Sequence, residues 1–75
     1  MRVTVKVIGP LVYAAGFSEK ALTLAGSATA GELLARVNVG EHRPTIVTRN
    51  GKAVSPLDTL EDGDRIVISP IYSGG

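Results

Sequence analysis

The chain has 75 residues, a formal net charge of +1 and no cysteine. This length allows one domain with one small hydrophobic core. The low net charge gives no field that would attract nucleic acid or an anionic membrane, so we expect neither as a partner. The absence of thiols excludes disulfides, thiolate zinc ligands and a cysteine nucleophile.

The N-terminal part of the chain predicts two strands. In residues 2–8, RVTVKVI, valines alternate with polar residues, which is typical of a half-buried strand. Gly9-Pro10 ends this strand, and a loop containing Gly16 follows. Residues 20–25, KALTLA, alternate again, so the two strands form a hairpin with a long loop.

A short helix follows. Thr29 and Glu32 have the spacing of a capping box, in which each side chain binds a free backbone N–H at the helix start. Asn38 and Gly40 are stop signals. Four apolar residues recur at helical spacing and predict one buried stripe: Ala30, Leu33, Leu34 and Val37.

The C-terminal part predicts three strand segments. Residues 45–54, TIVTRNGKAV, predict a hairpin with a type I′ turn at Asn50-Gly51. Residues 65–69, RIVIS, predict a last strand whose pairing ends near Pro70, because proline lacks the N–H that the ladder needs.

The segment between these strands is rich in turn residues. Leu57 and Leu60, three positions apart, predict a single helical turn that fills the core. Its acidic residues predict a turn exposed to solvent: Asp58, Glu61, Asp62 and Asp64.

These elements predict an α+β fold with one helix across a mixed sheet of four to five strands. The first and last segments are rich in β-branched residues, so we expect them to be neighbouring central strands. That arrangement is the ubiquitin-like β-grasp. We expect the domain to cover residues 1–70 and residues 71–75 to be a flexible tail that ends in Gly-Gly.

The sequence has little catalytic chemistry. His42 is the only histidine and is expected to be exposed in a loop, and no phosphate-binding loop is present. The carboxylate of Gly75 remains, and neither Gly75 nor Gly74 has a side chain that would obstruct an approaching active site. The residues after Pro70 could extend about 17 Å, enough to enter a narrow channel.

Docking of a partner is expected on the sheet face away from the helix. The alternate residues of the strands then point outward and form an exposed aliphatic patch, if the inward residues are Val3, Val5, Val7, Val47, Ile66 and Ile68. The predicted docking residues, including one in the tail, are Lys6, Ile8, Ile46, Thr48, Val67 and Tyr72.

Several motifs occur together in one order: the helix start at residues 29–34, TAGELL, the Asn50-Gly51 turn, LEDGD at residues 60–64 and the final SGG. This set resembles the MoaD/ThiS family of ubiquitin-like sulfur carriers over nearly the whole chain. Pro70 and SGG are more similar to MoaD tails, which favours the molybdopterin pathway.

The resemblance implies a carrier rather than an enzyme, and one able to act as the small subunit of a sulfur-transferring synthase. A ubiquitin-activating-type enzyme, using its own ATP and magnesium, would adenylate Gly75. A persulfide donor would then supply sulfur, leaving a thiocarboxylate for an acceptor synthase subunit. Gly74 and Ser73 would give the partner's active site access to the Gly75 carboxylate. This chain would bind no cofactor or metal.

Other functions remain open from the sequence. Gly75 could be conjugated to lysines as a ubiquitin-like modifier, or the chain could be a non-catalytic β-grasp interaction module. Sulfur could go to thiamine, cysteine or tRNA thiolation instead of molybdopterin. With no apolar stretch near the roughly 20 residues of a membrane span and no signal-peptide pattern, we expect a cytoplasmic protein.

Overall fold

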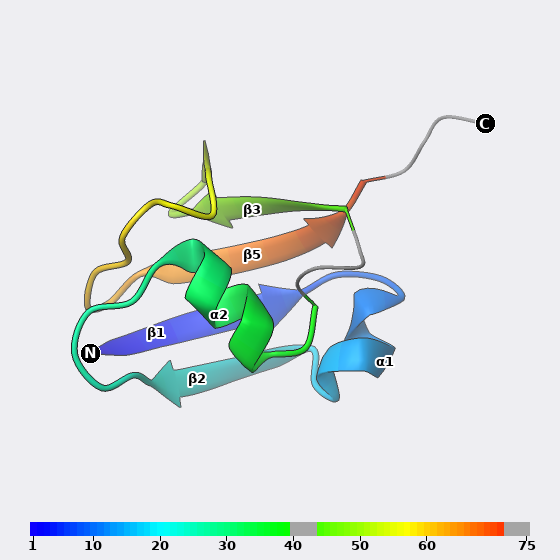
Figure 1. Cartoon of the computed structure of the whole chain (residues 1–75). Coiled ribbons are helices and arrows are strands. Elements are labelled where there is room, and N and C mark those ends of the chain that lie inside the picture. The colour runs from blue at the N-terminus through cyan, green and yellow to red at the C-terminus, as the bar shows by residue number, and fades with distance from the viewer. Residues whose placement is uncertain (40–43, 72–75) are drawn as a thin grey trace.

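The computed structural model describes residues 1–39 and 44–71. Within these residues, a five-stranded mixed sheet has the order β2-β1-β5-β3-β4, and α2 lies across one of its faces (Figure 1). This is the predicted β-grasp fold. The elements are β1 (Arg2–Val7), α1 (Leu11–Ala15), β2 (Glu19–Thr23), α2 (Ala30–Arg36), β3 (Thr45–Arg49), β4 (Lys52–Val54) and β5 (Arg65–Pro70).

The first and last strands are the central neighbours, as predicted. β1 and β5 run parallel, with Val5 opposite Ile66 and Val7 opposite Ile68. All four of these side chains are buried between the sheet and α2. Two antiparallel hairpins, β1–β2 and β3–β4, extend the sheet on either side of this pair.

The turn between β3 and β4 also has the predicted geometry. Asn50 and Gly51 both have positive φ, 52° and 87°, the combination that a type I′ turn requires. The turn therefore sets the register of β3 and β4, in which Arg49 pairs with Lys52.

Helix α2 is stabilised by its cap and by its buried stripe. The Thr29 side chain accepts a hydrogen bond from the Glu32 N–H (3.2 Å), and the Glu32 carboxylate accepts one from the Thr29 N–H (3.0 Å). The four predicted stripe residues are all buried against the sheet. Asn38, with φ 62°, ends the helical path, whereas Gly40 and His42 lie outside the described residues.

Replacing Thr29 with alanine should lower the free energy of unfolding by about 1 kcal/mol, because an N-cap hydrogen bond is lost from a helix of two turns. Urea denaturation followed by circular dichroism measures the change. Ser27→Ala, at an exposed position just before the helix, is the control and should be close to neutral. Equal effects of the two substitutions would contradict a stabilising cap.

The expectation of a single helix is wrong, because α1 lies in the segment predicted as a loop. Pro10 is its N-cap residue, and Gly16 ends it with φ 85° while its N–H donates to Val12 O. Leu11 is buried in the core. Proline at the start and glycine past the end are helix signals that the sequence carried, but five residues are too few for a helix to form without such packing.

The expected core turn at Leu57 and Leu60 is half wrong. Leu60 is buried, but Leu57 is 87% exposed. The turn runs only from Ser55 to Asp58, where the Asp58 N–H donates to Ser55 O, and it does not continue as a helix. The chain then pairs with the residues before α2, where the Leu60 N–H donates to Ala28 O, and this pairing turns only Leu60 inward.

One residue of the acidic stretch is buried, which contradicts the prediction of a wholly exposed turn. Asp64 is 5% exposed. Its carboxylate accepts hydrogen bonds from Asn50 Nδ2 (3.0 Å) and the Glu61 N–H (2.8 Å), and it lies 3.7 Å from Arg49 Nε. Asp64 therefore joins the β3–β4 turn to the start of β5.

Candidate docking face and C-terminal site

The sheet holds the chain one residue beyond β5. Pro70 pairs with Thr45, and the Ile71 N–H donates to Pro44 O at 3.2 Å. Only the four residues 72–75 follow, and they lie outside the described residues. In any conformation these residues span at most about 14 Å. A partner that acts on Gly75 therefore has to reach close to Ile71.

The predicted outward residues do lie together on the open face of the sheet. Val67 is flanked by Lys6 on β1 and Thr48 on β3. Ile46 pairs with Ser69, and the Ile8 N–H donates to Ile68 O, which continues the parallel ladder. Val47, the predicted inward residue of β3, is buried. Tyr72, the last predicted docking residue, lies outside the described residues.

Aliphatic side chains surround Ser69 on this face. Val67 and Ile71 lie two positions before and after Ser69 along the chain. Ile46 lies opposite Ser69 on β3, and Ile8 directly follows β1. Ile46 is 47% and Ile71 51% exposed, which makes them two of the large hydrophobic residues most exposed in the described structure. We call this group the aliphatic cluster: Ile8, Ile46, Val67 and Ile71. Ile71 was missing from the sequence prediction because it was assigned to a tail.

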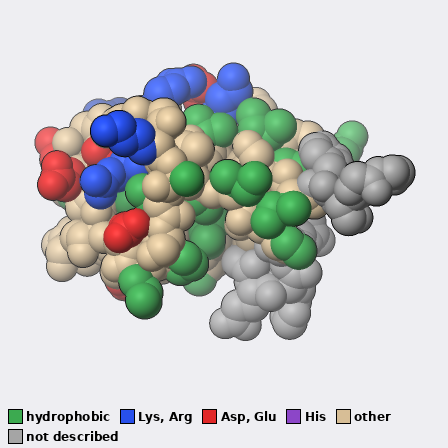
Figure 2. Space-filling model, turned by 90° about the horizontal axis from the view of Figure 1, so that it is seen from above, with side chains coloured by type: hydrophobic (Ala, Val, Ile, Leu, Met, Phe, Trp, Pro, Cys, Tyr) green, Lys and Arg blue, Asp and Glu red, His purple; other side chains and the backbone are tan. Residues whose placement is uncertain are grey.

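The ends of the molecule differ in charge. In Figure 2 most charged side chains lie toward one end of the molecule, and hydrophobic side chains are concentrated toward the other end. The described segments around the start of the tail carry no charged residue: residues 7–18, 44–48 and 66–71. Charged residues are depleted in the centres of protein interfaces, so this end of the sheet has the composition of a docking surface.

Metal-binding clusters and pockets are other features of the described residues that could hold chemistry. In residues 1–39 and 44–71 no three His, Cys, Asp or Glu side chains lie close enough to hold a metal ion. A pocket of about 240 Å³ lies between α2 and the end of β2, but its one carboxylate, Glu32, is bound to the Thr29 cap. No helix in the described part of the chain has the length and apolar character needed to span a bilayer.

Comparison with known proteins gives a family match and several structural matches. The family model described as the ThiS family matches residues 5–75. A search of curated proteins finds no match. SAMP1 from Haloferax volcanii is 25% identical, with all of both chains covered and a TM-score of 0.77.

Two further solved structures are similar to this chain. A putative molybdopterin converting factor, subunit 1, from Pyrococcus furiosus is 22% identical, with 96% of this chain and 99% of that chain covered and a TM-score of 0.80. The complex of subunits 1 and 2 of the molybdopterin-converting factor from Helicobacter pylori contains a chain that is 25% identical. All of both chains are covered, with a TM-score of 0.67.

Proposed function

Because this chain belongs to the ThiS family, we propose that it is a sulfur carrier whose Gly75 carboxylate is converted to a thiocarboxylate. The observation that supports this most is the family match, which includes both the folded domain and Gly74-Gly75. The hydrogen bond from Ile71 to Pro44 adds a physical argument. It fixes Ile71, the residue before residues 72–75, within the aliphatic cluster of the docking face.

The chemistry starts from a carboxylate, which is a poor electrophile. In the proposed first step a Gly75 carboxylate oxygen attacks the α-phosphorus of ATP on a ubiquitin-activating-type enzyme, and pyrophosphate leaves. ATP and magnesium are held by that partner. The reaction leaves an acyl-adenylate at Gly75, whose acyl carbon is open to attack because glycine has no side chain.

Sulfur enters in the second step. The terminal sulfur of a persulfide attacks the acyl carbon, and AMP leaves. A thiol then attacks the other sulfur of the resulting acyl disulfide, which releases the Gly75 thiocarboxylate and a disulfide. This chain supplies the acyl group and its position but no thiol, consistent with its lack of cysteine. We propose the cytoplasm, where ATP is present, as the location.

For the recipient of the sulfur, we propose an acceptor synthase subunit of the molybdopterin type. The names of the Pyrococcus furiosus and Helicobacter pylori structures favour this pathway, and the latter is a complex of two subunits. In this role the chain is a cosubstrate and not a catalyst. The match to SAMP1 favours a second candidate, a protein modifier joined to lysines through Gly75. The aliphatic cluster serves either role.

The mass of the intact protein, isolated from its own host, separates these functions. A population heavier by the difference between one sulfur and one oxygen atom, located at Gly75 by fragmentation, is expected of a carrier. A series of larger conjugates joined through Gly75 would instead identify a modifier. If every isolated chain ends in an unchanged carboxylate and no conjugate forms, the proposal is wrong.

A charge in the aliphatic cluster should weaken binding of the activating enzyme. Ile46→Asp is expected to raise the KM of that enzyme for the chain about tenfold or more, because it buries a carboxylate at an apolar contact. Turnover at saturation should change little, since the reacting carboxylate is elsewhere. ATP–pyrophosphate exchange measures both parameters.

The matched control is Ala35→Asp, which introduces the same charge at an exposed position of α2, on the covered side of the sheet. Its KM should equal that of the unsubstituted chain. If both variants bind equally well, the open face of the sheet is not where the enzyme docks.

A further inference from the structure

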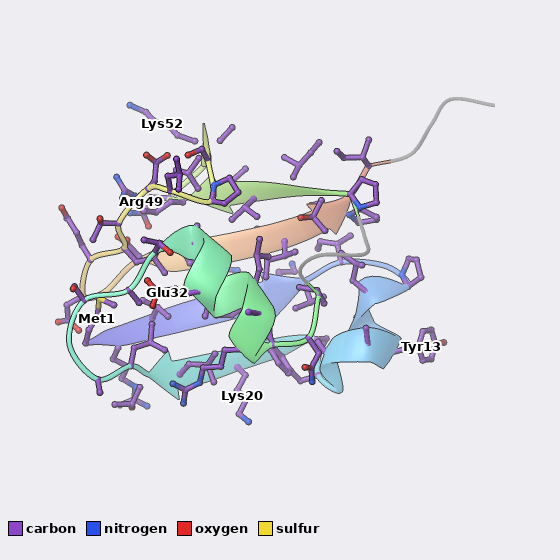
Figure 3. The ribbon with its side chains drawn as sticks, viewed as in Figure 1. Met1, Tyr13, Lys20, Glu32, Arg49 and Lys52 are labelled. Carbon is purple, nitrogen blue, oxygen red and sulfur yellow. The ribbon has the colours of Figure 1, made fainter. Side chains whose placement is uncertain are left out.

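Helix α1 presents one aromatic side chain that the fold does not use. Tyr13 is 89% exposed, whereas Leu11, in the same helix, is buried in the core. Figure 3 shows the Tyr13 ring pointing away from the molecule. An exposed ring contributes little to stability, but tyrosine is one of the residues on which binding energy concentrates at protein interfaces.

The position of α1 follows from the topology of the sheet. β1 and β5 are parallel neighbours, so the segments that follow them leave the sheet at the same end. Helix α1 follows β1 after three residues, and the last four residues of the chain follow Ile71 at the end of β5. Figure 1 shows α1 and the end of β5 on the same side of the molecule. Tyr13 and Ile71 are therefore displayed on one side of the molecule.

The length of the remaining chain determines which partner meets this end. Residues 72–75 span at most about 14 Å, so an active site that reacts with Gly75 lies no further than that from Ile71. An enzyme with a channel deep enough to enclose four residues has its surface pressed against the end of the sheet. That surface faces α1 as well as the aliphatic cluster.

The backbone of α1 is fixed by hydrogen bonds before any partner binds, which favours such a contact. Tyr13 N–H donates to Pro10 O and Val12 N–H to Gly9 O, so the turn that bears the ring is closed by its own hydrogen bonds. Residues 7–18 and 66–71 carry no charge, so α1 and the end of β5 both present uncharged side chains, whereas Lys6 lies on β1 beside Val67. Because the backbone that carries Tyr13 is already fixed, covering the ring with a partner costs side-chain rotamer freedom but little backbone freedom.

We propose that Tyr13 is a second docking contact for the enzyme that activates Gly75, separate from the open face of the sheet. This inference rests on the proposed function, because that function supplies the partner. It assigns to α1 a role in recognition: the partner contacts the molecule on two surfaces that meet where the last residues begin.

Substitutions at two residues of similar exposure, Tyr13 and the control residue Leu57, test the proposal. Leu57 is 87% exposed but lies in the connection before β5, next to the start of α2, where the Gly31 N–H donates to Pro56 O. Tyr13→Ser should raise the KM of the host's ubiquitin-activating-type enzyme for the chain about five- to tenfold in ATP–pyrophosphate exchange, with kcat unchanged. Leu57→Ser should leave both parameters unchanged, and unfolding midpoints verify that both variants fold.

The outcomes distinguish the two proposals. No exchange with the unsubstituted chain overturns the proposed function and this inference together. Normal exchange with an unchanged KM for Tyr13→Ser overturns the inference alone. Equal increases in KM for Tyr13→Ser and Leu57→Ser also overturn it, since the increase would then not be specific to the end of the sheet at which Ile71 lies.

Discussion

A chain that ends at Ser73, without Gly74 and Gly75, is expected to lose ATP–pyrophosphate exchange by more than about a hundredfold, since misplacement of a reacting group by even 1 Å can cost that much. Among the described residues, the last hydrogen bond to the sheet is at Ile71, and the truncated chain would keep only two residues beyond it. The new carboxylate would be withdrawn by about 7 Å. It would also sit on a serine, whose side chain has to fit where the glycine was.

This deletion should not change the stability of the folded domain. All the buried core residues and all the strands of the described structure lie before residue 72. The truncated chain should therefore unfold at the same temperature and still bind the activating enzyme through the aliphatic cluster. It should act as a competitive inhibitor of the full chain. Ser73→Gly, which keeps the length of the chain, is the matched control. Activity in the truncated chain would overturn both roles proposed for Gly75.

Most of the fold could be predicted because its local signals agree with its packing. Alternating valines in β1, the capping box of α2 and the Asn50-Gly51 turn each specify one conformation and one buried face, and each has that conformation in the structure. Helix α1 was missed because its signals are weak and its stability depends on Leu11 reaching the core. A helix of five residues is fixed by tertiary contacts, which a local pattern does not contain.

The candidate site divides in the same way. The outward positions of Lys6, Thr48 and Val67 follow from the two-residue period of a strand, so the sequence predicted them. Ile71 was missed because its position depends on a hydrogen bond to Pro44, the residue before β3. Tyr13 was missed because its place at the same end of the sheet as Ile71 depends on the parallel order of the central strands. The roles of Gly74 and Gly75 remain predictions.

The burial of Asp64 is the largest departure from the sequence interpretation, and it leads to a prediction of its own. Replacing Asp64 with alanine should reduce the free energy of unfolding by about 3 kcal/mol, because three polar partners lose a buried carboxylate. Those partners are Asn50 Nδ2, the Glu61 N–H and the Arg49 guanidinium. At present no buried side-chain nitrogen or oxygen among the described residues lacks a hydrogen bond. The substitution would leave several unpaired.

The size of this effect matters because a domain of this kind has only about 5–15 kcal/mol to lose. A loss of about 3 kcal/mol should lower the midpoint of thermal unfolding by about 10–25 °C. Asp62→Ala is the matched control: Asp62 is exposed and accepts one hydrogen bond, from the Arg2 N–H, so its loss should cost about 1 kcal/mol or less. Asp64→Asn, which keeps the shape but not the charge, should fall between the two. If Asp64→Ala and Asp62→Ala have the same midpoint of thermal unfolding, the buried carboxylate does not hold the β3–β4 turn to β5. The acidic stretch would then be the solvent-exposed turn that its composition predicts.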